Sequence, residues 1–292
     1  MNYNDVLQTA VSIAHEAGLI VRRRFPRTAL ADIGFKSATE PVTETDTIVE
    51  GLIVARLQDA FPGHHILAEE SGLIVRDGTE ADGELLSTSL PESITGGETP
   101  VWVVDPVDGT NNFAHGFPHV GISMALLVAG RPVVGVVYDP LREETFAAAA
   151  GSGATLDGQP MRVSRVEHLA DAFLATGFPR DRRTAADNNA ERLDHFVRRS
   201  LGVRQFGAAV LDLAYVACGR LDAHWEMRLK PWDVAAGVLL VREAGGRVTD
   251  FEGGPDCVFG DSIVASNSHI HDQMLRVIRE GAAAPRPDGL AG

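Results

Sequence analysis

Apolar residues recur at helical spacing at the beginning of the chain. Between residues 4 and 25 they return every three or four positions, and Pro26 stands where such a helix would have to end. A second stretch of the same kind starts at Thr43 or Thr45 and reaches Phe61, where a Pro-Gly pair closes it. This part of the chain therefore predicts two amphipathic helices.

The segments around the second helix are less regular. Residues 30–42 are polar and without periodicity, which predicts a loop. The short apolar segment 64–68 predicts a strand that ends at Glu69. Residues 72–100 are rich in Gly, Ser, Thr, Asp and Glu, and they predict a long loop that either serves as a functional lid or is disordered.

Continuous apolar runs predict a sheet in the middle of the chain. Residues 101–104 form one run, which delivers Asp105 to its carboxyl end, and Pro106 is expected to stop sheet pairing there because it lacks a backbone N–H. Tight turns separate the runs that follow, as in an antiparallel meander. These further strands are expected at residues 120–128, 133–138, 145–150 and 161–163.

Strands and helices alternate in the rest of the chain, as they do in parallel or mixed sheets. The strands are expected at 172–176, 203–206, 221–225, 247–249 and 263–265, and the helices at 187–200, 208–218, 232–244 and 268–280. The pattern predicts a protein of the α/β (α+β) class with two halves, 1–165 around an antiparallel sheet and 166–281 of alternating elements. Residues 282–292 are expected to form a disordered tail.

The composition is that of a globular protein with an acidic surface. The formal net charge of -14 on 292 residues argues against a nucleic-acid partner, because phosphate backbones are bound through an excess of Lys and Arg. Cys218 and Cys257 lack the spacing of a zinc or redox motif, and they imply no disulfide. No signal peptide and no apolar run of membrane-spanning length is recognisable, so we expect a cytoplasmic protein without a membrane partner.

Acidic residues gather where predicted strands end and where a predicted helix begins. Glu69 follows one strand, Asp105 and Asp108 belong to a turn that reads DPVDGT, and Asp233 stands at the start of a helix. The carbonyl of Val107 adds an oxygen to the same turn. Hard divalent cations prefer oxygen ligands, and carboxylates collected in this way would assemble a two-metal phosphoryl-transfer site.

Each of these acids also has an explanation without a metal. Asp-Pro and Asp-Gly are common turn dipeptides, which accounts for DPVDGT as a plain turn. Asp46 and Asp233 both lie in the first turn of a predicted helix, where the macrodipole favours a carboxylate. A solvated position at the end of a strand accounts for Glu69 and Glu226. From the residues alone, both interpretations stay open.

Four stretches together resemble the signatures of the inositol monophosphatase family, whose members are Mg²⁺-dependent, lithium-sensitive phosphatases. They are FKSATEPVTETD at 35–46, AEES at 68–71, WVVDPVDGTNNF at 102–113 and WDVAAGVLLVREAGG at 232–246. The resemblance covers roughly residues 5–280. It implies the layered α-β-α-β-α sandwich of the sugar phosphatase and inositol monophosphatase type, with two or three Mg²⁺ ions in each active site.

The resemblance also implies a role for each acidic residue. One metal ion would be held by Glu69, Asp105 and the backbone carbonyl of Val107. A second ion would be held by Asp105, Asp108 and Asp233. Because a bound metal lowers the pKa of water, such a site needs no side-chain nucleophile.

The same resemblance implies the catalytic and substrate-binding residues. Thr110, hydrogen-bonded to Asp46, would orient and activate the attacking water, and Glu69 is the third catalytic residue. A carboxylate among the substrate contacts can accept hydrogen bonds from neighbouring hydroxyl groups, which suits a phosphorylated polyol. The expected substrate contacts are Asp108, Gly109, Thr110, Gly207, Ala208, Ala209, Glu226 and Asp233.

The expected reaction is hydrolysis of inositol-1-phosphate to inositol and phosphate by a homodimeric enzyme. Related branches of the family hydrolyse fructose-1,6-bisphosphate, histidinol phosphate or 3'-phosphoadenosine 5'-phosphate on the same metal site, so these substrates remain alternatives. Another alternative is a regulatory protein that keeps the fold and binds the transcription machinery. A long loop between Glu70 and Asp105, and Ala208 in place of a hydroxyl residue, distinguish this chain and are expected to affect specificity.

Overall fold

The computed structural model describes residues 1–25, 34–37, 40–42, 44–74 and 97–283. The helices are α1 (Tyr3–Arg24), α2 (Glu44–Ala60), α4 (Thr110–Ala114), α5 (Ala190–Val197), α6 (Ala209–Ala217), α7 (Pro231–Glu243) and α8 (His271–Ala283), with a 3₁₀ turn at Leu169–Asp171. The strands are β1 (Gly34–Ser37), β2 (Glu40–Val42), β3 (His65–Ala68), β4 (Gly72–Ile74), β5 (Val101–Asp108), β6 (Gly121–Val128), β7 (Arg131–Asp139), β8 (Glu144–Ala149), β9 (Ala154–Leu156), β10 (Gln159–Pro160), β11 (Phe173–Thr176), β12 (Gly202–Arg204), β13 (Ala223–Met227), β14 (Arg247–Thr249) and β15 (Ser262–Ser266).

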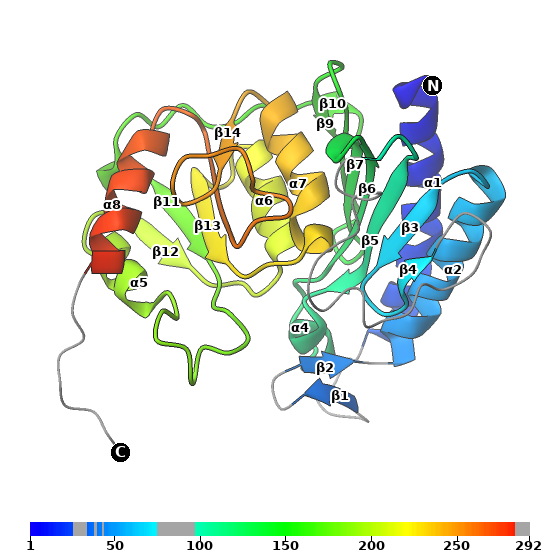
Figure 1. Ribbon diagram of the computed structural model, residues 1–292, viewed down its shortest axis with the longest axis horizontal. Coiled ribbons are helices and arrows are strands. Elements are labelled where there is room, and N and C mark those ends of the chain that lie inside the picture. Colours follow the sequence, from blue (N-terminus) through cyan, green and yellow to red (C-terminus); the bar gives the residue numbers. More distant parts are fainter. Residues whose placement is uncertain (26–33, 38–39, 43, 75–96, 284–292) are drawn as a thin grey trace.

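Helices and sheets alternate in five layers. Helices α1 and α2 cover the outer face of an eight-stranded sheet, α6 and α7 lie between that sheet and a five-stranded one, and α5 and α8 cover the outer face of the smaller sheet (Figure 1). Three hydrophobic cores fill the contacts between the layers, one under α1 and α2, one under α5 and α8, and one that surrounds α6 and α7 and reaches both sheets. The predicted α-β-α-β-α sandwich of the α/β (α+β) class is therefore confirmed.

The first helix forms because its apolar positions share one face and its ends are satisfied. The side chain of Asn2 accepts a hydrogen bond from the amide of Asn4 at 3.1 Å, and the amide of Phe25 donates to the carbonyl of Val21 at 2.8 Å. The buried face packs with α2 against the larger sheet, in a core that includes the fully buried Trp102. The helical spacing of residues 4–25 thus predicts this element correctly.

Strand β5 lies near the middle of the larger sheet, whose strand order is β10-β9-β8-β7-β6-β5-β3-β4. It runs parallel to β3 and antiparallel to β6. Val101 and Val103 enter the core under α6 and α7, while Trp102 and Val104 enter the core under α1 and α2. Because both faces of the strand are buried, its sequence is a continuous apolar run rather than an alternating one.

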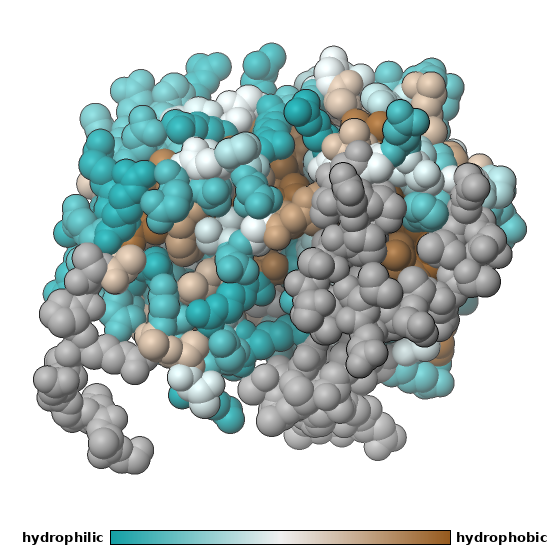
Figure 2. Space-filling view, viewed as in Figure 1, coloured by the Kyte–Doolittle hydropathy of each residue, from teal (hydrophilic) through white to brown (hydrophobic). Residues whose placement is uncertain are grey.

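The smaller sheet has the order β12-β11-β13-β15-β14. Strand β11 is parallel to β12 and β13, whereas β15 is antiparallel to β13 and β14. Trp225 of β13 points to the outer core, where its ring lies 4.0 Å from that of Phe196 on α5. Hydrophilic residues cover most of the visible face of this half (Figure 2), in line with the charge of the chain.

Several element boundaries differ from the sequence prediction. Residues 34–37 and 40–42 form the antiparallel pair β1 and β2 within the predicted loop. No strand forms at 161–163 in the described chain, and the short strands β9 and β10 precede that segment instead. Helix α5 begins later than predicted, because Asn189 adopts a left-handed conformation with φ of 73° and interrupts the helical path.

Some predictions concern residues outside the described part of the chain. Most of the long predicted loop, residues 75–96, lies outside it, and β4 occupies the start of that loop. Helix α8 continues to Ala283, so the first two residues of the predicted tail are helical, and residues 284–292 lie outside the description. Among the described helices, none combines the length and apolar character needed to cross a membrane.

Candidate active site

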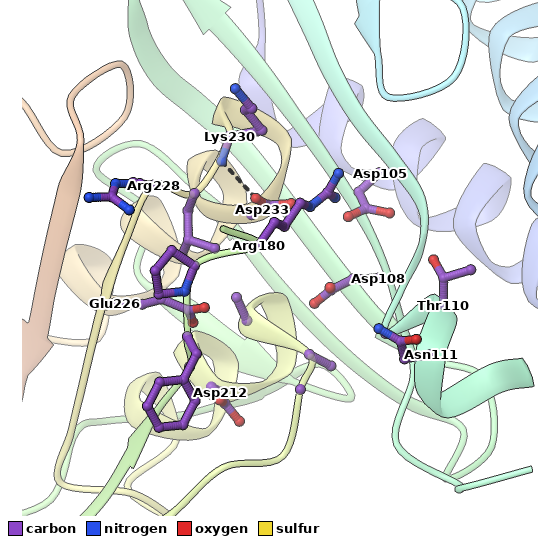
Figure 3. A pocket seen from close by; sticks show the side chains of 18 of the residues that line it. Asp105, Asp108, Thr110, Asn111, Arg180, Asp212, Glu226, Arg228, Lys230 and Asp233 are labelled. Carbon is purple, nitrogen blue, oxygen red and sulfur yellow. Dashed lines mark hydrogen bonds between the residues drawn. The ribbon is translucent and has the colours of Figure 1, made fainter. Parts of the chain in front are cut away.

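A cavity of about 300 Å³ opens where the carboxyl ends of β3 and β5 face the carboxyl ends of β11 and β13. Asp105, Asp108 and Thr110 reach it from the larger sheet, and Arg180, Glu226 and Asp233 reach it from the other half (Figure 3). Carboxyl ends of parallel strands share one edge of a sheet, so residues that follow such strands lie side by side. The cavity is therefore built from segments that are far apart in sequence.

Glu69 and Asp105 are brought together by the parallel pairing of β3 with β5. The register aligns Ala68 with Val104, and the amide of Glu69 continues the ladder by donating to the carbonyl of Val104 at 3.2 Å. Each strand thus passes from an apolar residue to a carboxylate at the same level. This pairing explains why an acid follows both apolar runs in the sequence.

Pro106 interrupts the pairing of β5 with β6 without ending the strand. The ladder is irregular between Asp105 and Asp108, and it resumes where Asp108 pairs with Gly121. The amide of Val107 turns back to Oδ1 of Asp105 at 3.0 Å. The prediction that pairing stops at Pro106 was thus too strict, because a bulge accommodates the missing N–H and both acids stay on the cavity wall.

Gly109 is required by the geometry of the acidic turn. Its φ is +86°, and a Cβ at this position would lie 2.9 Å from the carbonyl oxygen of His119. A larger residue would be strained by its backbone and would push against that carbonyl. The glycine therefore lets the chain leave β5 and begin α4 directly at Thr110.

The hydroxyl of Thr110 contacts two oxygens, one on α2 and one in the acidic turn itself. Its Oγ1 lies 3.2 Å from Oδ1 of Asp46 and 3.2 Å from the carbonyl of Val107. Asp46 comes from the first turn of α2, where the helix dipole favours a carboxylate, and it is only 1% exposed. The structure thus places the predicted pair Thr110 and Asp46 in hydrogen-bond contact.

The start of α6, in the second half of the chain, contacts Asp108. The amide of Val210 donates to Oδ2 of Asp108 at 2.8 Å. Asn112 fixes the approach of the preceding segment, because its Nδ2 donates to the carbonyls of His119 and Phe206, at 2.8 Å in each case. Gly207, whose φ is +78°, then turns the chain into the helix.

Asp233 is held at the start of α7. Pro231 occupies the first helical position, and Oδ2 of Asp233 accepts the amide of Lys230 at 2.7 Å. Glu226 lies at the end of β13, beside the backbone of Gly177, where a Cβ would lie 2.0 Å from its Oε1. Both carboxylates line the same cavity as Asp108.

The pKa values of the carboxylates in the cavity are raised, so their simultaneous ionisation is unfavourable. Burial raises the pKa of Asp105 well above its usual range, and the charges of Glu69 and Asp108 raise it further. Burial and the charge of Asp233 raise the pKa of Asp108 in the same way. Burial raises the pKa of Asp233 to about 6, although the amide of Lys230 opposes the shift. A bound cation would relieve this repulsion.

Basic side chains also line the cavity, in the half of the chain that carries Glu226 and Asp233. Arg180 lies with its Nη2 3.4 Å from Oε1 of Glu69, and Arg228 pairs with Asp181 at 2.7 Å. Arg182 and Lys230 line the same cavity. A ligand in this space therefore meets both carboxylates and cations, as a metal-associated phosphate group would.

A sequence model of the inositol monophosphatase family matches residues 2–283. This chain belongs to the inositol monophosphatase family. The match extends from the first helix to α8 and thus includes every residue of the cavity wall. The resemblance found in the four sequence stretches is confirmed over the whole described fold.

The proteins that are similar to this chain include a Nus factor and an inositol monophosphatase. The Nus factor SuhB of Pseudomonas aeruginosa is 42% identical over 281 residues, which are 94% of this chain and 96% of that protein. The inositol monophosphatase of Anabaena (Nostoc) sp. PCC 7120 has a TM-score of 0.81 at 37% identity, covering 96% of this chain and 97% of that one.

Two solved structures of SaIMPase-II, from Staphylococcus aureus, hold different phosphate esters. The complex with inositol monophosphate is 27% identical, with a TM-score of 0.72 and coverage of 93% of this chain and 92% of that one. The complex with 2'AMP is 26% identical, with a TM-score of 0.74 and coverage of 96% of both chains. One fold in this family thus accommodates a polyol and a nucleotide.

Proteins of the inositol monophosphatase family are generally metal-dependent, and the donor set of this cavity fits a hard cation. As they stand, no three Asp, Glu, His or Cys side chains of the described residues converge closely enough to enclose an ion. Asp108 and Asp233 each accept a backbone amide, and Glu69 is paired with Arg180. The crowding of buried carboxylates, with pKa values raised by burial and then by their mutual repulsion, is the feature that a divalent cation would complete.

Of the residues that the sequence singles out, all but one line this cavity. They are Glu69, Asp105, Val107, Asp108, Gly109, Thr110, Gly207, Ala208, Ala209, Glu226 and Asp233. Asp46 lies behind Thr110 instead. Sequence reasoning missed Arg180, Arg182 and Asp212, which also line the cavity. The run PRDRR at 179–183 was a visible signal of basic residues, whereas nothing in the sequence distinguishes Asp212 from a capping residue of its helix.

Proposed function

We propose that this protein is a Mg²⁺-dependent phosphomonoesterase that hydrolyses inositol-1-phosphate to inositol and phosphate with a metal-activated water. The observation that carries the proposal is the meeting of Glu69, Asp105, Asp108 and Asp233 in one cavity with the hydroxyl of Thr110. Buried carboxylates whose charges repel one another are a poor arrangement for stability and a good one for binding divalent metal.

In this proposal, two sets of oxygen atoms share the metals. Glu69, Asp105 and the carbonyl of Val107 would hold one Mg²⁺, and Asp105, Asp108 and Asp233 would hold another, with a third ion as the upper limit that the family resemblance allows. When bound, Mg²⁺ polarises phosphoryl oxygens and lowers the pKa of water, which supplies the nucleophile and stabilises the leaving oxygen.

Thr110 and Asp46 act on the water in this proposal. Oγ1 of Thr110 donates to Oδ1 of Asp46 and accepts a hydrogen bond from the attacking water, which fixes that water on one side of the phosphorus atom. The water oxygen bonds to phosphorus as the ester P–O bond breaks; of the two water protons, one ends on the leaving oxygen, which departs as an alcohol, and the other remains on the hydrogen phosphate. The backbone amides of Gly109 and Thr110 lie next to this position and are available to the phosphate oxygens.

Substrate recognition is assigned to the second half of the cavity. Glu226 is a carboxylate and can accept hydrogen bonds from two neighbouring hydroxyl groups of a polyol. Gly207, Ala208 and Ala209 lead into α6, where backbone amides face the same space. The complex of SaIMPase-II with inositol monophosphate supports a polyol substrate, and its complex with 2'AMP keeps nucleotide esters among the alternatives.

A comparison of substrates tests this choice. The purified protein is expected to release phosphate from inositol-1-phosphate with Mg²⁺, with a higher kcat/KM than for fructose-1,6-bisphosphate, histidinol phosphate or 3'-phosphoadenosine 5'-phosphate. A clear preference for one of the other three would contradict inositol-1-phosphate as the substrate, but it would leave the assignment as a phosphatase intact. Absence of turnover on all four would contradict the enzymatic proposal.

The name of two similar proteins favours a second candidate, a transcription-associated regulatory protein. Relatives from Pseudomonas aeruginosa and Escherichia coli are both called Nus factor SuhB. The two functions are separable, because Asp108→Asn changes a cavity residue and leaves the outer surface intact. Binding to the transcription machinery that survives this substitution, together with wild-type protein that lacks turnover, would favour the regulatory role alone.

Other expectations from the family resemblance stay proposals. We propose a homodimer that works in the cytoplasm, is inhibited by lithium and binds neither nucleic acid nor membranes directly. We also keep the division at residue 165, with the larger sheet in 1–165 and substrate contacts in 166–281. Light scattering tests the homodimer, and an assay with added LiCl tests inhibition by lithium.

A further inference from the structure

A histidine lies inside the smaller sheet, directly behind the proposed substrate carboxylate. His224 and Glu226 are two residues apart on β13 and therefore point to the same face, toward α6, whereas Trp225 points to the opposite core. The neighbouring strands place Ala175 and Ala265 beside His224. These small residues leave room for the imidazole ring, which is 0% exposed.

The ring of His224 lies between two carboxylates. Its Nδ1 is 3.5 Å from Oδ2 of Asp212, and its Nε2 is 3.4 Å from Oε2 of Glu226. On the far side of Asp212, Oδ1 lies 3.8 Å from Nε2 of His119. The four side chains form a buried row, His119, Asp212, His224 and Glu226, that runs from the start of β6 through α6 to the cavity.

The row is held by contacts of 3.4–3.8 Å rather than by aligned hydrogen bonds. Neither nitrogen of His224 has a hydrogen bond of good geometry among the described residues, and the same holds for Nε2 of His119 and Oδ1 of Asp212. Burial of a polar group without such bonds is costly, so the ion-pair contacts must compensate. The proposed metal ligands are not members of this row.

The pKa shifts agree with that arrangement. Burial by itself lowers the pKa of His224, but the contact with Glu226 and the charges of Asp212 and Glu226 outweigh it and raise the pKa above its ordinary value. Burial raises the pKa of Glu226, and His224 partly offsets this shift. His224 thus favours the charged form of the carboxylate that faces the cavity.

Gly177 supports Glu226 from the other side. A Cβ at Gly177 would lie 2.0 Å from Oε1 and 2.4 Å from Oε2 of Glu226, so the carboxylate rests directly on this backbone. The carboxyl group is therefore confined between the glycine after β11 and the ring of His224. A side chain confined in this way loses little freedom when a ligand binds.

We propose that His224, which rests on Asp212, is a positioning residue that holds Glu226 against the backbone of Gly177 and thereby makes the cavity selective for phosphate esters that carry neighbouring hydroxyl groups. The proposal rests on the proposed function only for the role of Glu226 as the hydroxyl acceptor. His224 itself touches no substrate, and its effect passes through Glu226.

Two substrates separate this role from a general loss of structure. Inositol-1-phosphate carries hydroxyl groups, and para-nitrophenyl phosphate carries none. In His224→Phe, KM for inositol-1-phosphate is expected to rise about tenfold, while kcat for both substrates and KM for para-nitrophenyl phosphate stay within about threefold of wild type. His224→Gln, which keeps an N–H near the position of Nε2, is expected to recover part of the affinity.

A matched variant and a double-mutant cycle complete the test. His271 is another fully buried histidine, bonded to Thr249 and Ser266 away from the cavity, and His271→Gln is expected to leave both KM values unchanged. If His224 acts through Glu226, His224→Phe adds little to the KM effect of Glu226→Gln. Equal KM changes for both substrates, or additive effects in the cycle, would overturn the proposal.

A spectroscopic readout does not depend on turnover. In ¹⁵N-labelled protein, the ring nitrogens of His224, assigned by their loss in His224→Phe, are expected to shift in Glu226→Gln and to stay unchanged in Asp194→Asn, an exposed acid on α5. Unchanged His224 signals in Glu226→Gln would refute the inference even in an active enzyme. A shift in protein that hydrolyses no phosphate ester would support the inference and contradict the proposed function.

Discussion

The hydroxyl of Thr110 lies 3.2 Å from a carboxylate oxygen of Asp46, across 64 positions of sequence. The contact joins the first turn of α2 to the first residue of α4, immediately after the acidic turn. Asp46 is buried at this point, so its carboxylate is not stabilised by contact with solvent. Through Thr110, which lines the cavity, the buried Asp46 is linked directly to the candidate active site.

Thr110→Ala is expected to lower kcat about 100-fold to 1000-fold with little change in KM, because the variant keeps the phosphate site and loses the group that orients water. Thr110→Ser keeps the hydroxyl and is the matched control, with kcat expected within about tenfold of wild type. Steady-state phosphate release at saturating Mg²⁺ measures both. Wild-type kcat in Thr110→Ala would remove this residue from the mechanism.

Asp46→Asn tests the contact from the other side. Because Asp46 acts through Thr110, the double variant Asp46→Asn with Thr110→Ala is expected to be about as slow as Thr110→Ala alone. Thermal unfolding of each variant controls for the buried position of Asp46. Losses that multiply in the double variant would mean that the two side chains act independently.

Arg180 competes with metal for Glu69 in this account, since the two side chains pair at 3.4 Å. Exposed ion pairs contribute about 0.2–1 kcal/mol, so Arg180→Gln is expected to lower the half-saturating Mg²⁺ concentration by about 1.5-fold to 5-fold. Titration of activity with Mg²⁺ measures the change. Arg228→Gln is the matched control, because Arg228 lines the same cavity but pairs with Asp181. A higher Mg²⁺ requirement in Arg180→Gln would contradict the competition.

His271 predicts a loss of stability in acid. Burial lowers the pKa of His271 to about 4, and the charge of Arg247 adds to the shift from the ordinary value of 6.5. Between pH 6.5 and 4 the unfolded chain binds the extra proton, so this contribution is fully present above 6.5 and is lost as the pH falls toward 4.

The measurement is the free energy of unfolding of wild type and His271→Gln at pH 7.5 and pH 4.5. The difference between the two proteins is expected to shrink at the lower pH, by on the order of 2 kcal/mol. Comparing the two proteins cancels the titration of all other groups. A difference that grows on acidification would show that His271 is protonated in the folded state.

Much of the fold was predictable because its signals are local. The spacing of apolar residues identified α1 and α2, and the unbroken run at 101–104 identified a strand that is buried on both faces. The bulge at Pro106 was not predictable in the same way, because it depends on how β6 meets β5 again at Gly121. Helix α4 has five residues, too few to produce a period.

The candidate site divides along the same line. Acids at strand ends and the start of α7 are visible in sequence because each follows or begins an element. Arg180 and His224 were missed because their importance comes from partners far away in sequence, Glu69 and Asp212. The Arg180 contact depends on how the two sheets face each other, and the His224 contact depends on how α6 packs on the smaller sheet; one sequence does not contain that information.

The most direct test of the account is phosphate release from inositol-1-phosphate by wild type, Asp108→Asn and the matched surface control Asp194→Asn, each with Mg²⁺ and with excess chelator. Asp108 is proposed to hold metal and accepts the amide of Val210, whereas Asp194 pairs with Arg198 on the exposed face of α5. The account predicts Mg²⁺-dependent turnover in wild type and Asp194→Asn, and at least about a 100-fold loss in Asp108→Asn. Wild-type turnover in Asp108→Asn, or full activity in chelator, would contradict it.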